Sequence, residues 1–388
     1  MLLLVVASVC ALMLVVAVTT LMWMLEAWRT PASLDGTRFR GDGAAPPEPV
    51  TPAGRLRFSL IVPARHEEAV LGTTLDGLAA LTHPDREVIV VVGDDDPATA
   101  AIAEQAAASH RGLRVVVDHS RPKNKPKALN AALPHCTGDV VGVFDAEDLV
   151  ASGLLERVEQ LFVTRPDVDV VQGGVQLMNF RSSWWALRNC LEYYFYFHSR
   201  LHLHARKGFI PLGGNTVFFR RSVLQEAGGW DPSCLAEDCD VGVRLSSSGS
   251  RVAVAFEPDL VTREETPDTI SSLLRQRTRW NQGFLQVLKK REWRRLPTPS
   301  QRLLARYTLS MPFLQAFVGI SVPAAMVMAF TLSIPLVAAL LTFIPAAIMT
   351  VTVAVETAAL REFGRSFSLK IRVRDYIRLV VGFLPYQL

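Results

Sequence analysis

Two carboxylates directly follow an apolar run with the composition of a buried strand. The run 140–144 reads Val-Val-Gly-Val-Phe, and Asp145-Ala146-Glu147-Asp148 comes immediately after it. Carboxylates two positions apart at a strand end can hold one divalent cation, Mg²⁺ or Mn²⁺, against a diphosphate, and the cation neutralises charge on a departing nucleotide. The alternative is that these are surface carboxylates at the start of a helix near Ser152, a role that Asp148 can fill even if Asp145 and Glu147 bind metal.

A second acidic pair stands at the predicted start of another helix. Glu237 and Asp238 follow the Gly-Gly-Trp-Asp string at 228–231 and precede Asp240. A carboxylate can act as the general base that takes a proton from an attacking hydroxyl, so the pair is a candidate for catalysis. The alternative is a favourable interaction with the helix dipole, which suits Asp240 well.

The strand-like run 87–92 also ends in acidic residues, Asp94, Asp95 and Asp96. A carboxylate at this position can hydrogen-bond the base or the ribose of a nucleotide. Asp96 precedes Pro97, and this order is typical of a helix N-cap followed by the first helical residue. We therefore expect Asp94 or Asp95 to bind the nucleotide, and the sequence does not separate the two.

A basic loop at 123–130, Lys-Asn-Lys-Pro-Lys-Ala-Leu-Asn, enters a predicted helix. Lysine side chains and a helix N-terminus both favour anionic oxygens, so the loop suits a diphosphate, with Lys127 as the expected ligand. A solvated basic turn is the alternative.

A predicted helix at 267–290 carries Gln276, Arg277, Arg279 and Trp280. At this spacing Gln276, Arg279 and Trp280 share one face. Arginine can grip phosphate oxygens through two hydrogen bonds, and a tryptophan ring can stack on a sugar. An ordinary helix can also carry arginines and one tryptophan, so the pattern gains weight only together with the acidic motifs.

The elements that must position these residues alternate between strands and helices. Strand-like runs at 58–62, 87–92, 113–117 and 140–144 are continuous rather than alternating, and helical patterns at 67–81 and 97–110 separate them. Continuous β-branched runs indicate strands that are buried on both faces, as in a parallel sheet covered by helices. The pattern predicts an α/β domain, in which ligands bind beyond the carboxyl ends of the strands.

Composition narrows the class of protein. The chain has 388 residues, a net charge of +4 and a mean hydropathy of +0.23, and its basic surplus lies beside apolar segments. This distribution suits an anionic lipid surface better than nucleic acid. The five scattered cysteines lack the spacing of a zinc site, so we expect them to be reduced and structural.

Apolar segments at both ends predict membrane spans. Residues 1–25 carry no charge, and the uncharged stretch 307–355 divides at Ser-Ile-Pro into predicted spans 307–332 and 336–356. The aromatic stretch 184–197 suits an interfacial segment or a buried domain helix equally. Basic residues beside the spans predict a multi-pass protein of the inner (plasma) membrane, with the N-terminus outside and the catalytic domain cytosolic.

Between these spans we expect a Pro/Gly-rich linker at 26–57 and a catalytic domain at 58–300. The last segment, 357–388, is basic. We expect it to lie at the membrane interface and to contain the start of a further membrane helix.

With these motifs in order, the chain resembles the membrane-bound family-2 glycosyltransferases of GT-A fold, the group that includes cellulose, chitin and hyaluronan synthases. The resemblance covers about 58–288 and the flanking helices. It implies that Asp94 or Asp95 holds the nucleotide and that Asp145 and Glu147 hold the metal. It also implies that Asp238 is the base, and that Gln276, Arg279 and Trp280 line the donor diphosphate and the acceptor end. Glu147 stands where the family usually has Asp, which changes reach but not charge.

The resemblance therefore predicts an inverting transfer of a sugar from a nucleotide-diphosphate donor, expected to be UDP-linked. The expected acceptor is a growing β-linked polysaccharide, and the alternatives are a single transfer to a membrane lipid or a non-catalytic subunit that binds nucleotide or glycan. Other expected partners are membrane lipids and either a second copy or a partner membrane subunit. The sugar and the linkage are left open.

Overall fold

The computed structural model describes residues 2–28, 56–331 and 336–387, and within the helices the side chains of residues 2–6 and 322–346 are not described. A seven-stranded sheet forms the centre, in the order β3-β2-β1-β4-β7-β5-β8. The pairs β1–β2, β2–β3, β1–β4 and β5–β8 are parallel, and only β7 runs antiparallel to its neighbours. The prediction of a mainly parallel α/β sheet is confirmed.

The strands of the large sheet are β1 (Phe58–Ala64), β2 (Arg86–Gly93), β3 (Leu113–Asp118), β4 (Val140–Val143), β5 (Val170–Gly173), β7 (Val217–Arg220) and β8 (Val252–Ala255). β6 (Val175–Leu177) and β9 (Thr262–Glu264) form a separate parallel pair. The four strands that the apolar runs predicted are all present. β5 to β9 are three or four residues long and gave no comparable signal.

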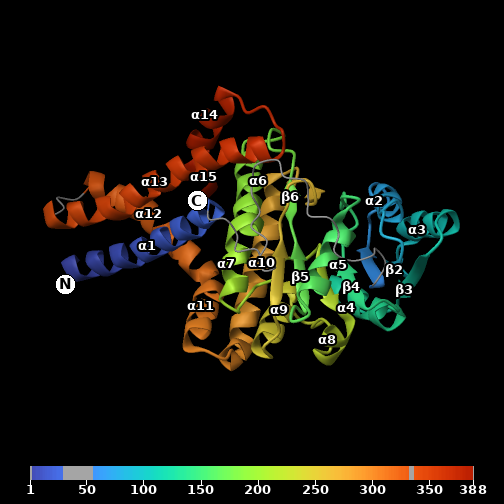
Figure 1. Cartoon of the computed structure of the whole chain (residues 1–388). Helices are drawn as coiled ribbons and strands as arrows, with labels where there is room; N and C mark the ends of the chain where they lie inside the picture. Colours follow the sequence, from blue (N-terminus) through green and yellow to red (C-terminus); the bar gives the residue numbers. More distant parts are fainter. Residues whose placement is uncertain (1, 29–55, 332–335, 388) are drawn as a thin grey trace.

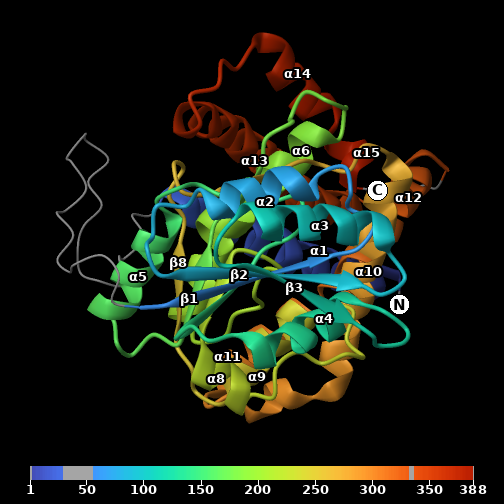
Figure 2. The same ribbon diagram turned by 90° about the vertical axis from the view of Figure 1, so that its right-hand side faces the viewer.

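Helices cover both faces of the sheet (Figure 2). One core lies under α2 (Leu71–Ala79), α3 (Pro97–Ser109) and α5 (Leu154–Thr164), and is centred on Leu60, Val90 and Phe144. The opposite core lies under α4 (Lys125–Ala132), α7 (Leu201–Arg206), α8 (Arg221–Glu226) and α9 (Glu237–Ser247). Burial of the β-branched runs on both faces explains why those runs do not alternate.

The predicted helices 97–110 and 267–290 are present as α3 and α10 (Ile270–Lys290), each within three residues of its expected ends. Asp96 caps α3 as expected, because its side chain accepts a hydrogen bond from the Thr99 amide. The helix expected at 67–81 is shorter, since α2 begins only at Leu71. The amides of residues 66 and 67 instead donate to side chains at the start of α3, and His66 has a φ of 60°.

α6 (Ala186–Phe195) is a buried domain helix, which decides between the two readings of the aromatic stretch. It is followed by a π-helical turn, η3 (Tyr196–Arg200), and packs against α13 (Leu336–Ser366) and α14 (Val373–Val381). The remaining short helices are η1 (Glu26–Trp28), η2 (Leu133–His135), η4 (Glu292–Arg295), α11 (Pro299–Leu309) and α15 (Phe383–Gln387).

The long terminal helices extend together away from the sheet (Figure 1), where α1 (Leu2–Leu25) packs along α13. The helix expected at 307–332 is divided, because α11 ends at Leu309 and α12 (Met311–Thr331) begins after a bend of 51°. The helix expected at 336–356 is the first part of α13, which continues to Ser366.

Among the described residues, one helical segment is long and apolar enough to cross a membrane, Ala7–Trp28, and the bent α11–α12 pair is a second if it counts as one span. The expected multi-pass topology with three spans is therefore not supported. Most of the linker predicted at 26–57, residues 29–55, lies outside the described residues.

Candidate active site

The acidic residues singled out in the sequence gather beyond the carboxyl ends of the parallel strands. Asp94 follows β2 and Asp145 follows β4, and both strands pair with β1 in parallel. Figure 2 shows that β1 and β2 end on the side of the sheet where α10 lies. This is the edge at which open α/β sheets bind ligands.

Lys125 lies among the candidate catalytic carboxylates Asp145 and Asp238. Its Nζ pairs with the Asp145 carboxylate and donates to the Gly214 carbonyl at 2.8 Å. Gly214 also lies against Asp238, since a Cβ added to Gly214 would be 3.2 Å from Asp238 Oδ2 and 3.6 Å from Lys125 Nζ. Burial alone would lower the pKa of Lys125, but the charges of Asp145, Glu237 and Asp238 outweigh it and raise that pKa.

Glu237 and Asp238 begin α9, as the sequence predicted. Burial, followed by the neighbouring Asp238 charge, raises the pKa of Glu237 to about 7. Burial also raises the pKa of Asp238, while the Cys239 amide, which donates to Asp238 Oδ1 at 2.7 Å, partly opposes that rise. A buried carboxylate with a raised pKa at a helix start beside a lysine has the properties of a general base.

Asp145 and Glu147 face further carboxylates, and this concentration of negative charge fits a cation. Burial and the Asp145 charge raise the pKa of Glu147, and Lys125 opposes them. Burial, Glu147 and Asp145 raise the pKa of Glu67 to about 7. No three His, Cys, Asp or Glu side chains in the described parts of the chain are arranged to hold a metal by themselves.

That finding agrees with the chemistry of magnesium and manganese sites at diphosphates. Mg²⁺ is commonly held by one or two carboxylates together with the phosphate oxygens of a substrate. Asp145 and Glu147 supply two such carboxylates, and the remaining ligands would come from the donor and from water. The residues present therefore fit a cation that is completed by its substrate.

Asp94 and Asp95 both lie at the end of β2, each with basic partners. Asp94 pairs with Arg121 at 2.9 Å and Lys123 at 2.7 Å, and these hydrogen bonds hold its pKa well below the usual range. Asp95 pairs with Arg65 at 2.9 Å. Both carboxylates are thus held in place at the expected edge.

Lys127 makes its hydrogen bonds to described residues within its own loop, and its contact with a diphosphate stays a prediction. Its Nζ donates to the carbonyl groups of Arg121 and Pro122, at 2.9 and 2.8 Å, within its own loop. Lys125 and Lys127 stand two positions apart in the first turn of α4. Two residues correspond to a rotation of about 200° around the helix axis, so the two side chains leave the helix on nearly opposite sides. The residue that the structure brings to the carboxylates is Lys125.

The residues of α10 divide between two faces. The Trp280 ring lies 6.4 Å from the ring of Tyr193, and the buried Gln276 Oε1 has no hydrogen-bond partner among the described residues. Arg279 instead is exposed and lines a 590 Å³ pocket together with Leu235. The expectation that Gln276, Arg279 and Trp280 share one face thus holds for Gln276 and Trp280.

Arg277 is committed to contacts within the protein. It donates to Glu192 at 2.8 Å, to Asn189 at 2.6 Å and to Tyr386 at 3.2 Å, and its guanidinium lies 4.8 Å from the Trp280 ring. The two arginines of the motif therefore differ, because Arg279 makes no ion pair with any described residue. This difference could not be read from the sequence.

A buried polar network that the sequence did not reveal supports the loop after β4. Asp148 accepts a hydrogen bond from the Asp145 amide at 2.8 Å and from the Asn215 amide group at 3.0 Å. Asn215 also donates to Glu264, and burial together with Asp145 raises the pKa of Glu264 to about 7. The hydrogen bond from the Asp145 amide to Asp148 thus fixes the backbone that carries the Asp145 carboxylate. The hydrogen bonds from Asn215 join residues 67 and 49 positions apart, so no local pattern in the sequence indicates the network.

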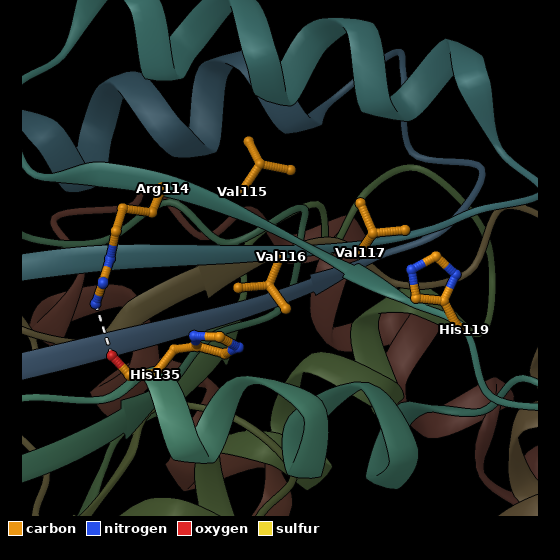
Figure 3. A pocket seen from close by; sticks show the side chains of 6 residues that line it. All are labelled: Arg114, Val115, Val116, Val117, His119 and His135. Carbon is orange, nitrogen blue, oxygen red and sulfur yellow. Dashed lines mark hydrogen bonds between the residues drawn. The ribbon is translucent and has the colours of Figure 1, made fainter.

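A second pocket, of 320 Å³, lies at the outer edge of the sheet along β3 (Figure 3). It is lined by Val115, Val116 and Val117, by His119, and by Arg114 and His135, which are joined by a 2.6 Å hydrogen bond. It touches the candidate site only through His119, whose Nδ1 lies 3.1 Å from Asp94. None of the predicted site residues lines it.

Known proteins resemble this chain in sequence and share its architecture. The family model "Glycosyltransferase like family 2" matches residues 55–283. A mannosyltransferase from Pyrobaculum calidifontis, solved with GDP-mannose and Mn²⁺, superimposes with a TM-score of 0.63 at 22% identity, over 98% of this chain and 99% of that one. At this identity the likeness shows a shared GT-A-like fold.

Two groups of curated relatives have different acceptors in their names. The β-monoglucosyldiacylglycerol synthase of Synechocystis sp. is 30% identical over 249 residues, which are 63% of this chain and 50% of that protein. A poly-β-1,6-N-acetyl-D-glucosamine synthase of Staphylococcus epidermidis is 25% identical over 65% of this chain and 60% of that protein. The chain spans about half the length of the glucosyldiacylglycerol synthases it matches. Because the family model covers more than half of the chain, the protein belongs to the family-2 glycosyltransferases, enzymes that use nucleotide-sugar donors.

Proposed function

We propose that this chain is a metal-dependent, inverting glycosyltransferase that moves one sugar from a UDP-linked donor to the hydroxyl or phosphate oxygen of a membrane lipid. The observation that carries the transferase chemistry is the convergence of Lys125 with Asp145 and Asp238 around Gly214. It puts a cation and a candidate metal ligand beside a candidate base, as transfer from a diphosphate requires.

The donor would lie across the carboxyl ends of β2 and β4. Asp94 or Asp95 would hydrogen-bond the nucleoside, Lys125 would meet the diphosphate, and Arg279 would add a second cation. Asp145 and Glu147 would hold Mg²⁺ or Mn²⁺, which neutralises charge on the diphosphate when bound. Because Lys127 and Arg277 are hydrogen-bonded within the protein, this proposal gives the contacts with the diphosphate to Lys125 and Arg279.

The reaction itself is a displacement at the anomeric carbon. Asp238 takes the proton of the acceptor hydroxyl as the acceptor oxygen bonds to that carbon, and the bond from the carbon to the diphosphate oxygen breaks. An ionised phosphate acceptor would need no such proton transfer. Attack from the side opposite the leaving group inverts the configuration and gives a β-linkage from an α-linked donor. Lys125 stabilises the negative charge on the departing nucleoside diphosphate.

A lipid acceptor is favoured by the way α1 meets the domain. Ala7–Trp28, the candidate membrane span, ends against η3, where Ser199 donates to the Trp23 carbonyl. η3 also contains Tyr196, whose pKa is raised by burial and by the charge of Asp238. An acceptor held in the bilayer beside α1 would therefore lie close to the base. We propose on the same ground that the protein is anchored in the inner membrane, with its catalytic domain in the cytosol.

A growing β-linked polysaccharide, the acceptor that the sequence favoured, is the second candidate. The aromatic pair of Tyr193 and Trp280 supports it, because such rings stack on sugars. The two candidates differ in product size, since a lipid acceptor gives one addition and a polymer gives a ladder.

The test is nucleotide release by the purified protein in lipid with Mg²⁺ or Mn²⁺, across a panel of UDP- and GDP-sugars. With an acceptor that attacks through a hydroxyl group, such as diacylglycerol, Asp238→Asn should abolish release, whereas Asp76→Asn, which changes an exposed carboxylate on α2, should leave it intact. Full activity of Asp238→Asn with that acceptor would refute the assignment of the base. Failure of every donor with the wild-type protein would refute the proposed transfer.

A further inference from the structure

The π-helical turn η3 forms the junction between the candidate membrane span and the catalytic domain. Ser199 donates to the carbonyl of Trp23, and a ring nitrogen of His198 lies 3.2 Å from the carbonyl of Ala27. π-helical turns are rare and are frequently found at functional sites, since the extra residue redirects the side chains around it. The same turn also presents the Arg200 side chain to the junction.

Arg200 forms no ion pair with a carboxylate among the described residues, although the charge of Glu192 acts on it from a distance. Its guanidinium lies 3.9 Å from the centre of the Trp23 ring and 5.9 Å from that of Tyr196. Its one hydrogen bond to a described residue is long, 3.5 Å from Nε to His204, and it forms no ion pair with a described carboxylate. Its two terminal nitrogens thus have donors to spare.

Other arginines at the same junction are paired, which makes Arg200 the exception. Arg188 forms a two-point ion pair with Glu356, at 3.0 and 2.8 Å, and Arg206 pairs with Glu26. A partly buried charge without a partner costs free energy that stacking on aromatic rings offsets only in part. Because Arg200 remains partly exposed, a ligand can still reach it.

Arg200 also lies on the path between α1 and the base. Tyr193, Tyr196 and Arg200 follow one another at three- and four-residue intervals, so they line one side of the helix. Tyr193 meets Trp280 of α10, and Tyr196 donates to the Pro211 carbonyl at 2.9 Å, three residues before Gly214. The row thus runs from the candidate active site to the membrane helix.

We propose that Arg200 binds a phosphoryl group carried by the acceptor lipid, and so selects a phosphate-bearing lipid over a neutral one. This inference rests on the proposed lipid acceptor. A guanidinium matches phosphate oxygens through two parallel hydrogen bonds, and the partner that Arg200 lacks among the described residues is an anion of this kind. Arg200 is a binding residue in this scheme and takes no part in the proton transfer.

The test compares Arg200→Met, which keeps the apolar stem, with Arg200→Lys, which keeps the charge. The matched control is Arg206→Met, which removes a paired arginine from the same junction. Each variant is assayed in phosphatidylcholine nanodiscs with diacylglycerol or with a polyprenyl phosphate as the acceptor. Losing a charged hydrogen-bond donor should raise the KM for the phosphate-bearing acceptor about tenfold to a hundredfold in Arg200→Met, with the donor KM unchanged and a smaller effect in Arg200→Lys.

An unchanged acceptor KM, an equal effect on both lipids, or an equal effect of Arg206→Met would overturn the proposal. Equal effects in the two methionine variants would mean that Arg200 only anchors α1. Binding of radiolabelled polyprenyl phosphate without any donor separates this proposal from the proposed transfer. Wild-type binding that is lost in Arg200→Met supports the site even if no sugar is transferred, and equal binding refutes it.

Discussion

Replacing Lys125 by Met removes the cation that joins three carboxylates, and Lys127→Met provides a matched control. Both lysines lie in the first turn of α4, two positions apart. Lys125 pairs with Asp145 and is surrounded by the charges of Glu237 and Asp238, whereas Lys127 donates to two backbone carbonyl groups. The same substitution on the same helix thus tests one site lysine and one loop lysine.

The size of the loss follows from the charges and their exposure. Two unit charges 4 Å apart interact by about 4 kcal/mol at an effective dielectric constant of ~20. The side chains of Lys125 and Asp145 are 28% and 35% exposed, so solvent reduces that value, and we expect a loss of about 2–3 kcal/mol in transition-state binding. This corresponds to roughly a 30- to 150-fold fall in kcat/KM. For Lys127→Met we expect about 0–1 kcal/mol.

The assay is nucleotide release in lipid between pH 6 and pH 9, with thermal unfolding of each variant as the control for folding. Lys125 lowers the pKa of Asp238, so its removal should raise that pKa further and move the acid limb of the pH profile to higher pH. Lys125→Met should therefore regain part of its activity on going from pH 7 to pH 8.5. Equal losses in the two lysine variants, or no recovery at high pH, would refute the reasoning.

Three further outcomes are expected. Gly283→Ala should lower turnover, and should lower the free energy of unfolding by about 1–3 kcal/mol, because its Cβ would lie 2.4 Å from the Cβ of Ala236, which precedes the acidic pair. Gly77→Ala has open space around it and should raise the free energy of unfolding by about 0.5–1 kcal/mol in chemical denaturation. The pKa of Glu264 is raised to about 7, and that of the buried Asp148 beside it is also raised. The contribution of these two groups to stability is therefore complete below about pH 4 and is lost as pH rises through about 7. The fall in melting temperature from pH 5 to pH 8 should be smaller in Asp148→Asn than in the wild-type protein. Chelation of divalent cations should stop nucleotide release, and added Mn²⁺ or Mg²⁺ should restore it.

The sheet could be predicted because its strongest signals are local. Runs such as Val88–Val92 are continuous, β-branched and buried on both faces, and Asp96 before Pro97 is a complete helix start within two residues. The acidic motifs were found for the same reason, since each directly follows a strand or begins a helix. β5 to β9 were not predicted in this way. β4 is equally short, but its apolar run continues to Phe144 and ends in the acidic motif, whereas β5, β6 and β9 each contain a polar residue that interrupts the apolar run.

Which residue of a motif reaches the candidate site depends on contacts between residues that are distant in the sequence. Lys125 and Lys127 are alike as residues, and only the position of α4 relative to Gly214 decides which one meets Asp145. Arg277 and Arg279 are likewise equivalent in the sequence, but Glu192, 85 positions away, takes the first of them. A motif therefore predicts the chemistry that is present, while the fold decides which of two similar side chains performs it.

α6 and η3 follow one another directly, and contacts with residues distant in the sequence join them to three other helices. Arg188 joins it to Glu356 of α13, Glu192 joins it to Arg277 of α10, and Arg200 joins it to Trp23 of α1. Two of these contacts lead to the long helices that extend from the domain, and the third leads to the helix that carries Gln276 and Trp280. α6 and η3 therefore connect the long helices α1 and α13 to α10. The two charges within the stretch 184–197, Arg188 and Glu192, also explain why it resembles an interfacial segment in the sequence, because their partners lie 168 and 85 positions away.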